Sequence, residues 1–216
     1  MTQRVRAWSS LSGIVFVVLA VLGPSFLFGG PTDSSPAKMA AYYRSSSHRT
    51  SFHIGWLLSG IGLFLLIWFV ASVRDRIAMH ERTDPTGGTV LSTIATIGGA
   101  AFVAVALVVI GTADGIKTMS DDTFQHLVYS GVIHGANDSA YMMLVSGGAA
   151  MAAFIFAVSL ATFAFGLLPR WIGWFGILAG VAALLSLFFF TMLLWLLWIA
   201  VASIALFMRA RVSPAT

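Results

Sequence analysis

One stretch of the chain repeats polar residues at every fourth position: Asp122, His126, Ser130, His134 and Asp138. Side chains four residues apart lie on the same face of a helix, one turn above the other. A histidine and a carboxylate in that relation can bind a divalent metal, or the carboxylate can orient the imidazole for acid–base chemistry. The same spacing also fits a hydrated helix face without chemistry, and two glycines within it weaken the case for an unbroken helix.

His53 is expected near the outer end of the second apolar stretch. Asp114 closes the third and could face Asp138, where two carboxylates could bind a cation or could simply be hydrated helix ends. Together with the repeated residues they could form an outer-facing vestibule for a small ligand, an ion or a proton. If a divalent metal binds, His134 and Asp138 are the expected ligands. Because Asp138 follows Asn137, it could equally be the favourable negative charge at the start of a helix.

Several kinds of chemistry are disfavoured. The chain has no cysteine, which excludes disulfides, thiolate metal sites and a cysteine nucleophile. We find no phosphate-binding glycine loop and no hydrolase or zinc-protease motif. A b-type haem is disfavoured because no histidine is expected at mid-membrane. We therefore predict no cofactor, leave a divalent metal open, and favour a non-enzymatic role.

The composition predicts a membrane protein. Of 216 residues, 58% are hydrophobic and only 9% are charged, against roughly 25% charged in soluble domains; the mean hydropathy is +0.91. So few charges exclude a disordered chain, a nucleic-acid-binding module and a soluble enzyme, and they make the lipid bilayer the main partner.

The apolar runs predict an all-α, single-domain bundle (1–216) with six transmembrane helices. The expected spans are residues 8–28, 52–73, 90–111, 140–168, 171–189 and 191–208. The last two come from one uncharged run of 38 residues whose turn is marked by neither glycine nor proline. With six spans and both termini cytoplasmic, eight of the 12 basic residues face inward, as the positive-inside rule requires. The inner segment 74–88 is typical of a solvated turn.

Other residues are expected to anchor and pack the helices. Ser35-Pro36 favours the start of an outer amphipathic helix over residues 35–46. Membrane-interface anchors are expected at Tyr42, Tyr43, Trp171 and Trp174. Close helix packing is expected at Gly147, Gly148, Gly176 and Gly180. One of these glycine faces, or a ridge formed by Trp195 and Trp198, could instead contact a second copy or another membrane protein.

Several segments together carry a family resemblance. They include Ala7-Trp-Ser-Ser-Leu-Ser-Gly-Ile, Ser35-Pro-Ala-Lys-Met-Ala-Ala-Tyr-Tyr43, Asn137-Asp138 and Leu168-Pro-Arg-Trp-Ile-Gly-Trp174. On these residues the chain resembles uncharacterised six-helix membrane proteins of actinobacteria. Those proteins are distantly similar to a bacterial domain-of-unknown-function family with the same Leu-Pro-Arg-Trp-x-Gly turn. The resemblance implies six spans and a multi-pass protein of the bacterial plasma membrane, and it implies no activity or catalytic residue.

Three functions remain open at this point. The absence of a catalytic motif favours an accessory, assembly or oligomeric membrane component. The outer histidines and carboxylates favour a protein that binds or transports a small ligand, an ion or protons. An intramembrane metalloenzyme is the third hypothesis, and it depends on His134 and Asp138.

Overall fold

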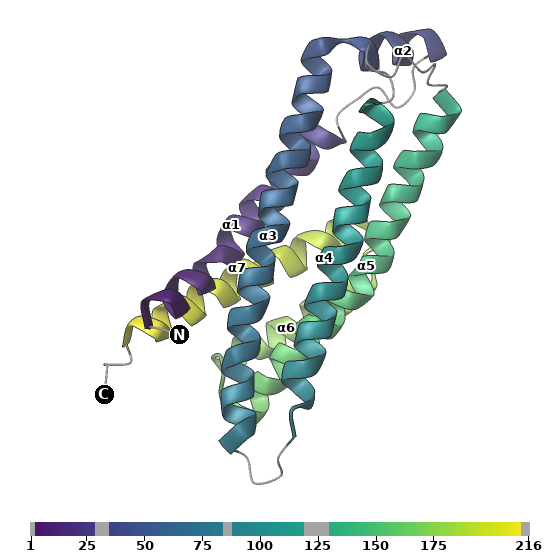
Figure 1. The fold of residues 1–216 in the computed structure, drawn as a ribbon. Coiled ribbons are helices and arrows are strands. Elements are labelled where there is room, and N and C mark those ends of the chain that lie inside the picture. The colour runs from purple at the N-terminus through teal and green to yellow at the C-terminus, as the bar shows by residue number, and fades with distance from the viewer. Residues whose placement is uncertain (1–2, 29–34, 84–87, 119–129, 213–216) are drawn as a thin grey trace.

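The computed structural model describes residues 3–28, 35–83, 88–118 and 130–212. These ranges hold seven helices and no strand, which confirms the all-α class (Figure 1). The helices are α1 (Gln3–Leu27), α2 (Pro36–Arg44), α3 (Ser46–Thr83), α4 (Val90–Thr118), α5 (Ser130–Phe165), α6 (Arg170–Leu184) and α7 (Phe189–Val212). Figure 1 shows α2 lying across one end of the bundle, which we call the α2 end.

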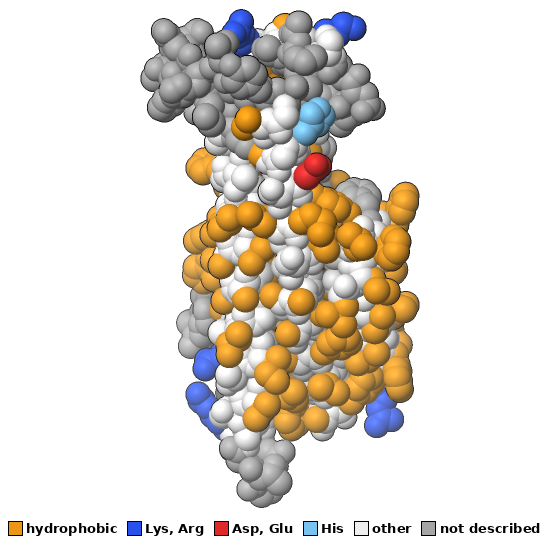
Figure 2. Space-filling model, turned by 90° about the vertical axis from the view of Figure 1, so that its right-hand side faces the viewer, with side chains coloured by type: hydrophobic (Ala, Val, Ile, Leu, Met, Phe, Trp, Pro, Cys, Tyr) orange, Lys and Arg blue, Asp and Glu red, His pale blue; other side chains and the backbone are white. Residues whose placement is uncertain are grey.

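Five of the helices, α1, α3, α4, α5 and α7, contain stretches long and apolar enough to cross a membrane. In α3 the 20 residues from Ile54 to Val73 carry no charge, and at 1.5 Å per residue they span about 30 Å, the thickness of the hydrocarbon core. Figure 2 shows a broad apolar surface with basic side chains only at the two ends of the molecule. This surface indicates a membrane protein.

Glycine lets neighbouring helices approach closely along their length. A Cβ at Gly98 of α4 would lie 2.6 Å from the backbone oxygen of Ala150 in α5. The four glycines expected at packing positions lie at similar contacts within the chain, where a Cβ would meet a neighbouring helix: Gly147 against α4, Gly148 against the end of α6, Gly176 against α5 and α7, and Gly180 against α5.

The tryptophan ridge expected at an oligomer contact lies inside the bundle instead. Trp195 is 4% exposed and Trp198 is fully buried. The indole Nε1 of Trp198 donates a hydrogen bond to the backbone oxygen of Ile172, at 3.1 Å. Neither ring is available to a partner, because both fill the core between α7 and its neighbours.

The α6–α7 hairpin is shorter than the sequence predicted. α6 ends at Leu184 rather than near residue 189, and its 15 residues span only about 22 Å. Its turn, residues 185–188, lies against Tyr141, which is about 16 Å along α5 from the start of that helix. Figure 1 shows the hairpin ending well short of the α2 end, with α7 running obliquely back across the bundle.

Hydroxyl groups satisfy the backbone of this turn. The donors and their backbone acceptors are Ser186 to Ala183 at 2.6 Å, Thr191 to Leu185 at 2.9 Å and to Phe188 at 2.7 Å, and the phenol of Tyr141 to Leu187 at 2.7 Å. The surrounding side chains are apolar and exposed, up to 79% for Phe190. A turn in an apolar environment needs such internal partners, since no water is there to replace them.

We expect Tyr141→Phe to destabilise this turn, because the Leu187 carbonyl loses its phenol donor. The expected loss in the free energy of unfolding is about 1 kcal/mol, measured by thermal unfolding in mild detergent. Tyr42→Phe is the matched control, since the Tyr42 hydroxyl has no partner among the described residues. Equal stability of the two variants would show that the phenol does not hold the turn.

The opposite end of the bundle is more tightly built than a solvated turn. α3 continues to Thr83, and Glu81 is only 3% exposed. Its Oε1 accepts hydrogen bonds from the backbone N–H groups of Leu91 at 2.8 Å and Ser92 at 3.2 Å. Glu81 therefore caps the start of α4, which corrects our expectation for the segment 74–88.

Candidate functional site

The repeated polar residues lie partly on one long helix. α5 begins at Ser130 and runs without a break through His134 and Asp138, both of which are exposed. Gly131 and Gly135 do not interrupt it. Asp138 is the ninth residue of the helix, so the expected capping role for Asn137 and Asp138 is wrong. Asp122, His126 and the side chain of Ser130 lie outside the described residues.

His53 and Asp114 do come together. His53 Nδ1 lies 3.4 Å from Asp114 Oδ2, which joins α3 to α4 at the α2 end; the side chains are 52% and 14% exposed. In the ranges that the structure describes, no three histidine, aspartate or glutamate residues gather as metal ligands would.

α2 is fastened to this end by its tyrosines. Tyr43 is 3% exposed, packs 5.6 Å from the ring of Phe52 and shares a side-chain hydrogen bond with Asn137. Burial raises the pKa of Tyr43 above its ordinary value, and Tyr42 adds to the rise. Tyr42 stacks on His48, with ring centroids 3.8 Å apart. Tyr43 therefore holds α2 against the bundle rather than reaching lipid headgroups.

Trp171 and Trp174 lie in the first turns of α6, at the end opposite α2. Both are strongly exposed. The Trp174 ring lies 5.1 Å from that of Phe163 in α5, and nearby Arg209 donates hydrogen bonds to the backbone oxygens of Gly166 and Leu167, at 2.6 and 2.9 Å. The two tryptophans are exposed as interface anchors would be, and that role stays a prediction.

A cavity that the sequence did not reveal lies between α1 and α5, beside the start of α7. Its volume is about 670 Å³, within the roughly 300–1,000 Å³ range of small-molecule sites. Its walls come from five helices and are mainly apolar, with Phe16, Val21, Leu63, Phe102, Val109, Ile110, Leu144, Met192, Leu193 and Leu196 among them. The short hairpin is the reason for this space, because α7 begins only partway along α5.

A few polar groups belong to the cavity wall. Asn137 and Tyr141 contribute an amide and a phenol from α5. Ser59 Oγ and Trp195 Nε1 are buried and have no hydrogen-bond partner among the residues that the structure describes. The described residues that line the cavity include no charged side chain. Such an arrangement suits a molecule with a long apolar body and a small neutral polar group.

A proline in α1 adds to this polarity. Pro24 lies inside the helix and has no N–H, so the carbonyl of Ala20 loses its usual helical donor. Both residues line the cavity. Pro24 and Trp195 can both be read from the sequence. Nothing in the local sequence relates them, because they lie on different helices.

Comparison with known proteins finds no match to this chain among family models, curated proteins or solved structures. The Leu-Pro-Arg-Trp turn that carried the family resemblance is the α5–α6 connection. In it Gly166 has a φ of 68°, a conformation that favours glycine, and Leu167 and Leu168 are buried.

Proposed function

We propose that the chain is a multi-pass protein of the bacterial plasma membrane with six membrane helices and both termini in the cytoplasm. In this topology α1, α3, α4 and α5 cross the bilayer, and α6 and α7 form a hairpin that enters from the inner side and returns to it. The exposed apolar side chains at the tip of the hairpin and its internally paired carbonyls support a position within the hydrocarbon.

The charges support this orientation. Among the basic residues whose side chains the structure describes, five lie at the end opposite α2 and three at the α2 end: Arg74, Arg76, Arg82, Arg170 and Arg209, against Lys38, Arg44 and Arg49. An excess of basic residues marks the cytoplasmic side. The α2 end would then face outward, and the cavity would lie in the outer leaflet.

The function that the geometry supports best is the binding of a neutral amphiphile in this cavity. The observation that supports this most strongly is a large apolar space whose wall contains two buried polar side chains, Ser59 and Trp195, without hydrogen-bond partners in the described part of the chain. An indole N–H is a donor only, so a ligand carbonyl, ester or hydroxyl oxygen would complement Trp195. The absence of charge in the described lining argues against an ionic headgroup inside it.

This proposal keeps ligand binding but moves the site, because none of the described vestibule residues His53, Asp114, His134 and Asp138 lines the cavity. The accessory or oligomeric hypothesis loses support, because the glycine contacts and the tryptophan ridge both serve packing within the chain. The metalloenzyme hypothesis also gains no support: the described residues bring His53 and Asp114 together but hold no group of three possible metal ligands.

The test is to fill the cavity. Ala106 is buried and lines it, whereas Ala149 is exposed on α5 and does not. Each alanine is replaced by phenylalanine, the proteins are purified in mild detergent, and the lipids that remain bound are extracted and measured by mass spectrometry. We expect wild type and Ala149→Phe to retain the same neutral amphiphile, and Ala106→Phe to retain about tenfold less, since a filled site loses the ligand's apolar contacts.

Thermal unfolding of each variant separates loss of ligand from loss of fold. If Ala106→Phe folds and retains as much amphiphile as Ala149→Phe, the cavity is not the binding site. If wild type retains no neutral amphiphile, the proposed function is wrong.

A further inference from the structure

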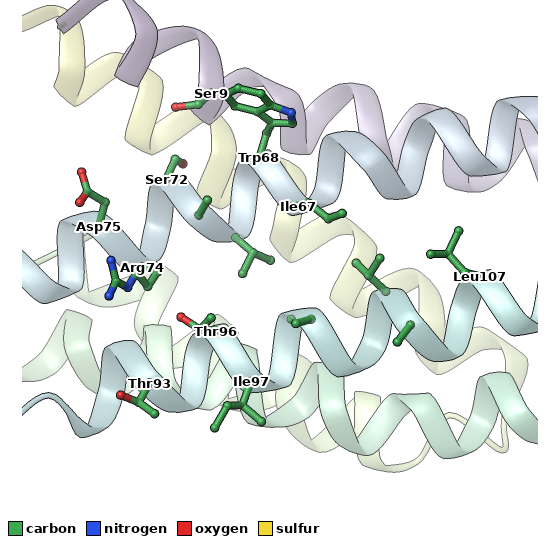
Figure 3. A pocket seen from close by; sticks show the side chains of 16 residues that line it. Ser9, Ile67, Trp68, Ser72, Arg74, Asp75, Thr93, Thr96, Ile97 and Leu107 are labelled. Carbon is green, nitrogen blue, oxygen red and sulfur yellow. The ribbon is translucent and has the colours of Figure 1, made fainter. Parts of the chain in front are cut away.

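A second hollow lies between α3 and α4, nearer the end opposite α2 (Figure 3). Its volume is about 940 Å³. Small exposed side chains make room for it, namely Ala71, Ala100 and Ala104, while bulkier ones such as Ile67, Ile97 and Leu107 border it. Along α4 it extends from Thr93 to Leu107, about 21 Å at 1.5 Å per residue. A groove of that length can hold the chain of a lipid from one leaflet, which is about 15 Å deep.

One end of this groove carries a positive charge. Arg74 lines it, is exposed, and makes no hydrogen bond or ion pair with the part of the chain that the structure describes. Figure 3 shows the Arg74 side chain between α3 and α4, with Thr96 extending from α4 toward it. Arg74 directly follows the uncharged stretch of α3, so it lies where headgroups meet the hydrocarbon.

The nearby carboxylate does not cancel this charge. Asp75 also belongs to the lining, but Figure 3 shows it pointing away from α4. Asp75 has an interaction partner of its own within the chain. The groove therefore presents, beside its apolar walls, a guanidinium that no described residue pairs.

We propose that this groove binds one anionic phospholipid, with its phosphate on Arg74 and one acyl chain along the alanines of α3 and α4. A guanidinium binds a phosphate through charge-assisted hydrogen bonds, often two at once. An acyl chain that lies against the small alanine side chains makes more van der Waals contacts than it would on an uneven helix surface. The occupant is a membrane lipid rather than a partner helix because the cation lies only at the headgroup end.

The experiment measures lipid retention by native mass spectrometry of the purified full chain. The probes are phosphatidylglycerol and phosphatidylcholine with identical acyl chains. We expect wild type to prefer phosphatidylglycerol by about five- to tenfold. Arg74→Gln should abolish the preference, and Arg74→Lys should keep most of it. Ala100→Leu should lower the retention of both lipids, because its side chain fills the groove.

Arg82→Gln is the matched control, because Arg82 is exposed at the same end and does not line the groove. Equal retention of both lipids by wild type, or an unchanged preference in Arg74→Gln, overturns the proposal. Loss of the preference in Arg82→Gln to the same extent as in Arg74→Gln also overturns it, since a diffuse surface charge then suffices. Ala106→Phe should leave the preference intact, which separates this site from the outer cavity.

Discussion

Replacing Gly148 by alanine is expected to lower the free energy of unfolding by about 1–3 kcal/mol. A Cβ at this position would overlap the backbone oxygen of Ala183 and lie 2.7 Å from Ser186 Oγ. Backbone cannot move aside as the end of a flexible side chain can. α5 and the end of α6 would therefore have to separate. This would also disturb the α6–α7 turn, in which the Ser186 hydroxyl donates a hydrogen bond to the Ala183 carbonyl.

Gly111→Ala provides the matched control for this substitution. Gly111 is also helical, but a Cβ there would meet nothing within 4 Å. Alanine in an open helical position stabilises by roughly 0.5–1 kcal/mol relative to glycine. The two variants should move in opposite directions in thermal unfolding monitored by circular dichroism in detergent. A stabilised Gly148→Ala would mean that the hairpin does not pack against α5 as described.

Glu81→Ala is expected to cost about 2–3 kcal/mol. The carboxylate is almost fully buried and accepts two backbone N–H groups at the start of α4. Its removal leaves those donors without the acceptor that they have in the native protein, and it removes a negative charge from a helix N-terminus. The damage should concentrate at the α3–α4 connection, where hydrogen exchange of Leu91 and Ser92 would rise first.

Two comparisons separate capping from a general effect of charge. Glu81→Gln keeps an oxygen acceptor and should lose only about 1 kcal/mol, the part that belongs to the charge. Asp138→Ala removes an exposed carboxylate from α5 and should have little effect. If Glu81→Ala proves as mild as Asp138→Ala, Glu81 does not hold the start of α4.

The helices were the most predictable part of this protein. Length and hydropathy are properties of a local segment, so the positions of the apolar helices and of the short helix before α3 could be found from the sequence. The length of α6 could not. Its end is determined by hydroxyl–carbonyl pairs, one of which joins Tyr141 to Leu187 across 46 residues, and local composition contains no sign of such a pair.

The candidate site was predictable only in part. His53 and Asp114 were both expected in the outer vestibule, and they do meet, although the pairing considered for Asp114 was with Asp138. A helix start at Asn137 and Asp138 was one of the two alternatives considered, and it is wrong, because residues that favour caps are tolerated inside a helix whose neighbours support it. The burial of Trp195 and Trp198 was missed, since a fully apolar helix gives no periodic signal for its inner face. The cavity required five helices in place before it existed.

Binding of a neutral amphiphile depends on one arrangement, in which the short α6–α7 hairpin leaves an apolar space in the half of the bundle nearer α2. An experimental density map of the full chain in a lipid nanodisc tests this most directly. We expect elongated density between α1 and α5, beside the start of α7, in contact with Ser59 and Trp195. A map in which α1 closes onto α5, or in which the α6–α7 turn reaches the α2 end, would contradict it.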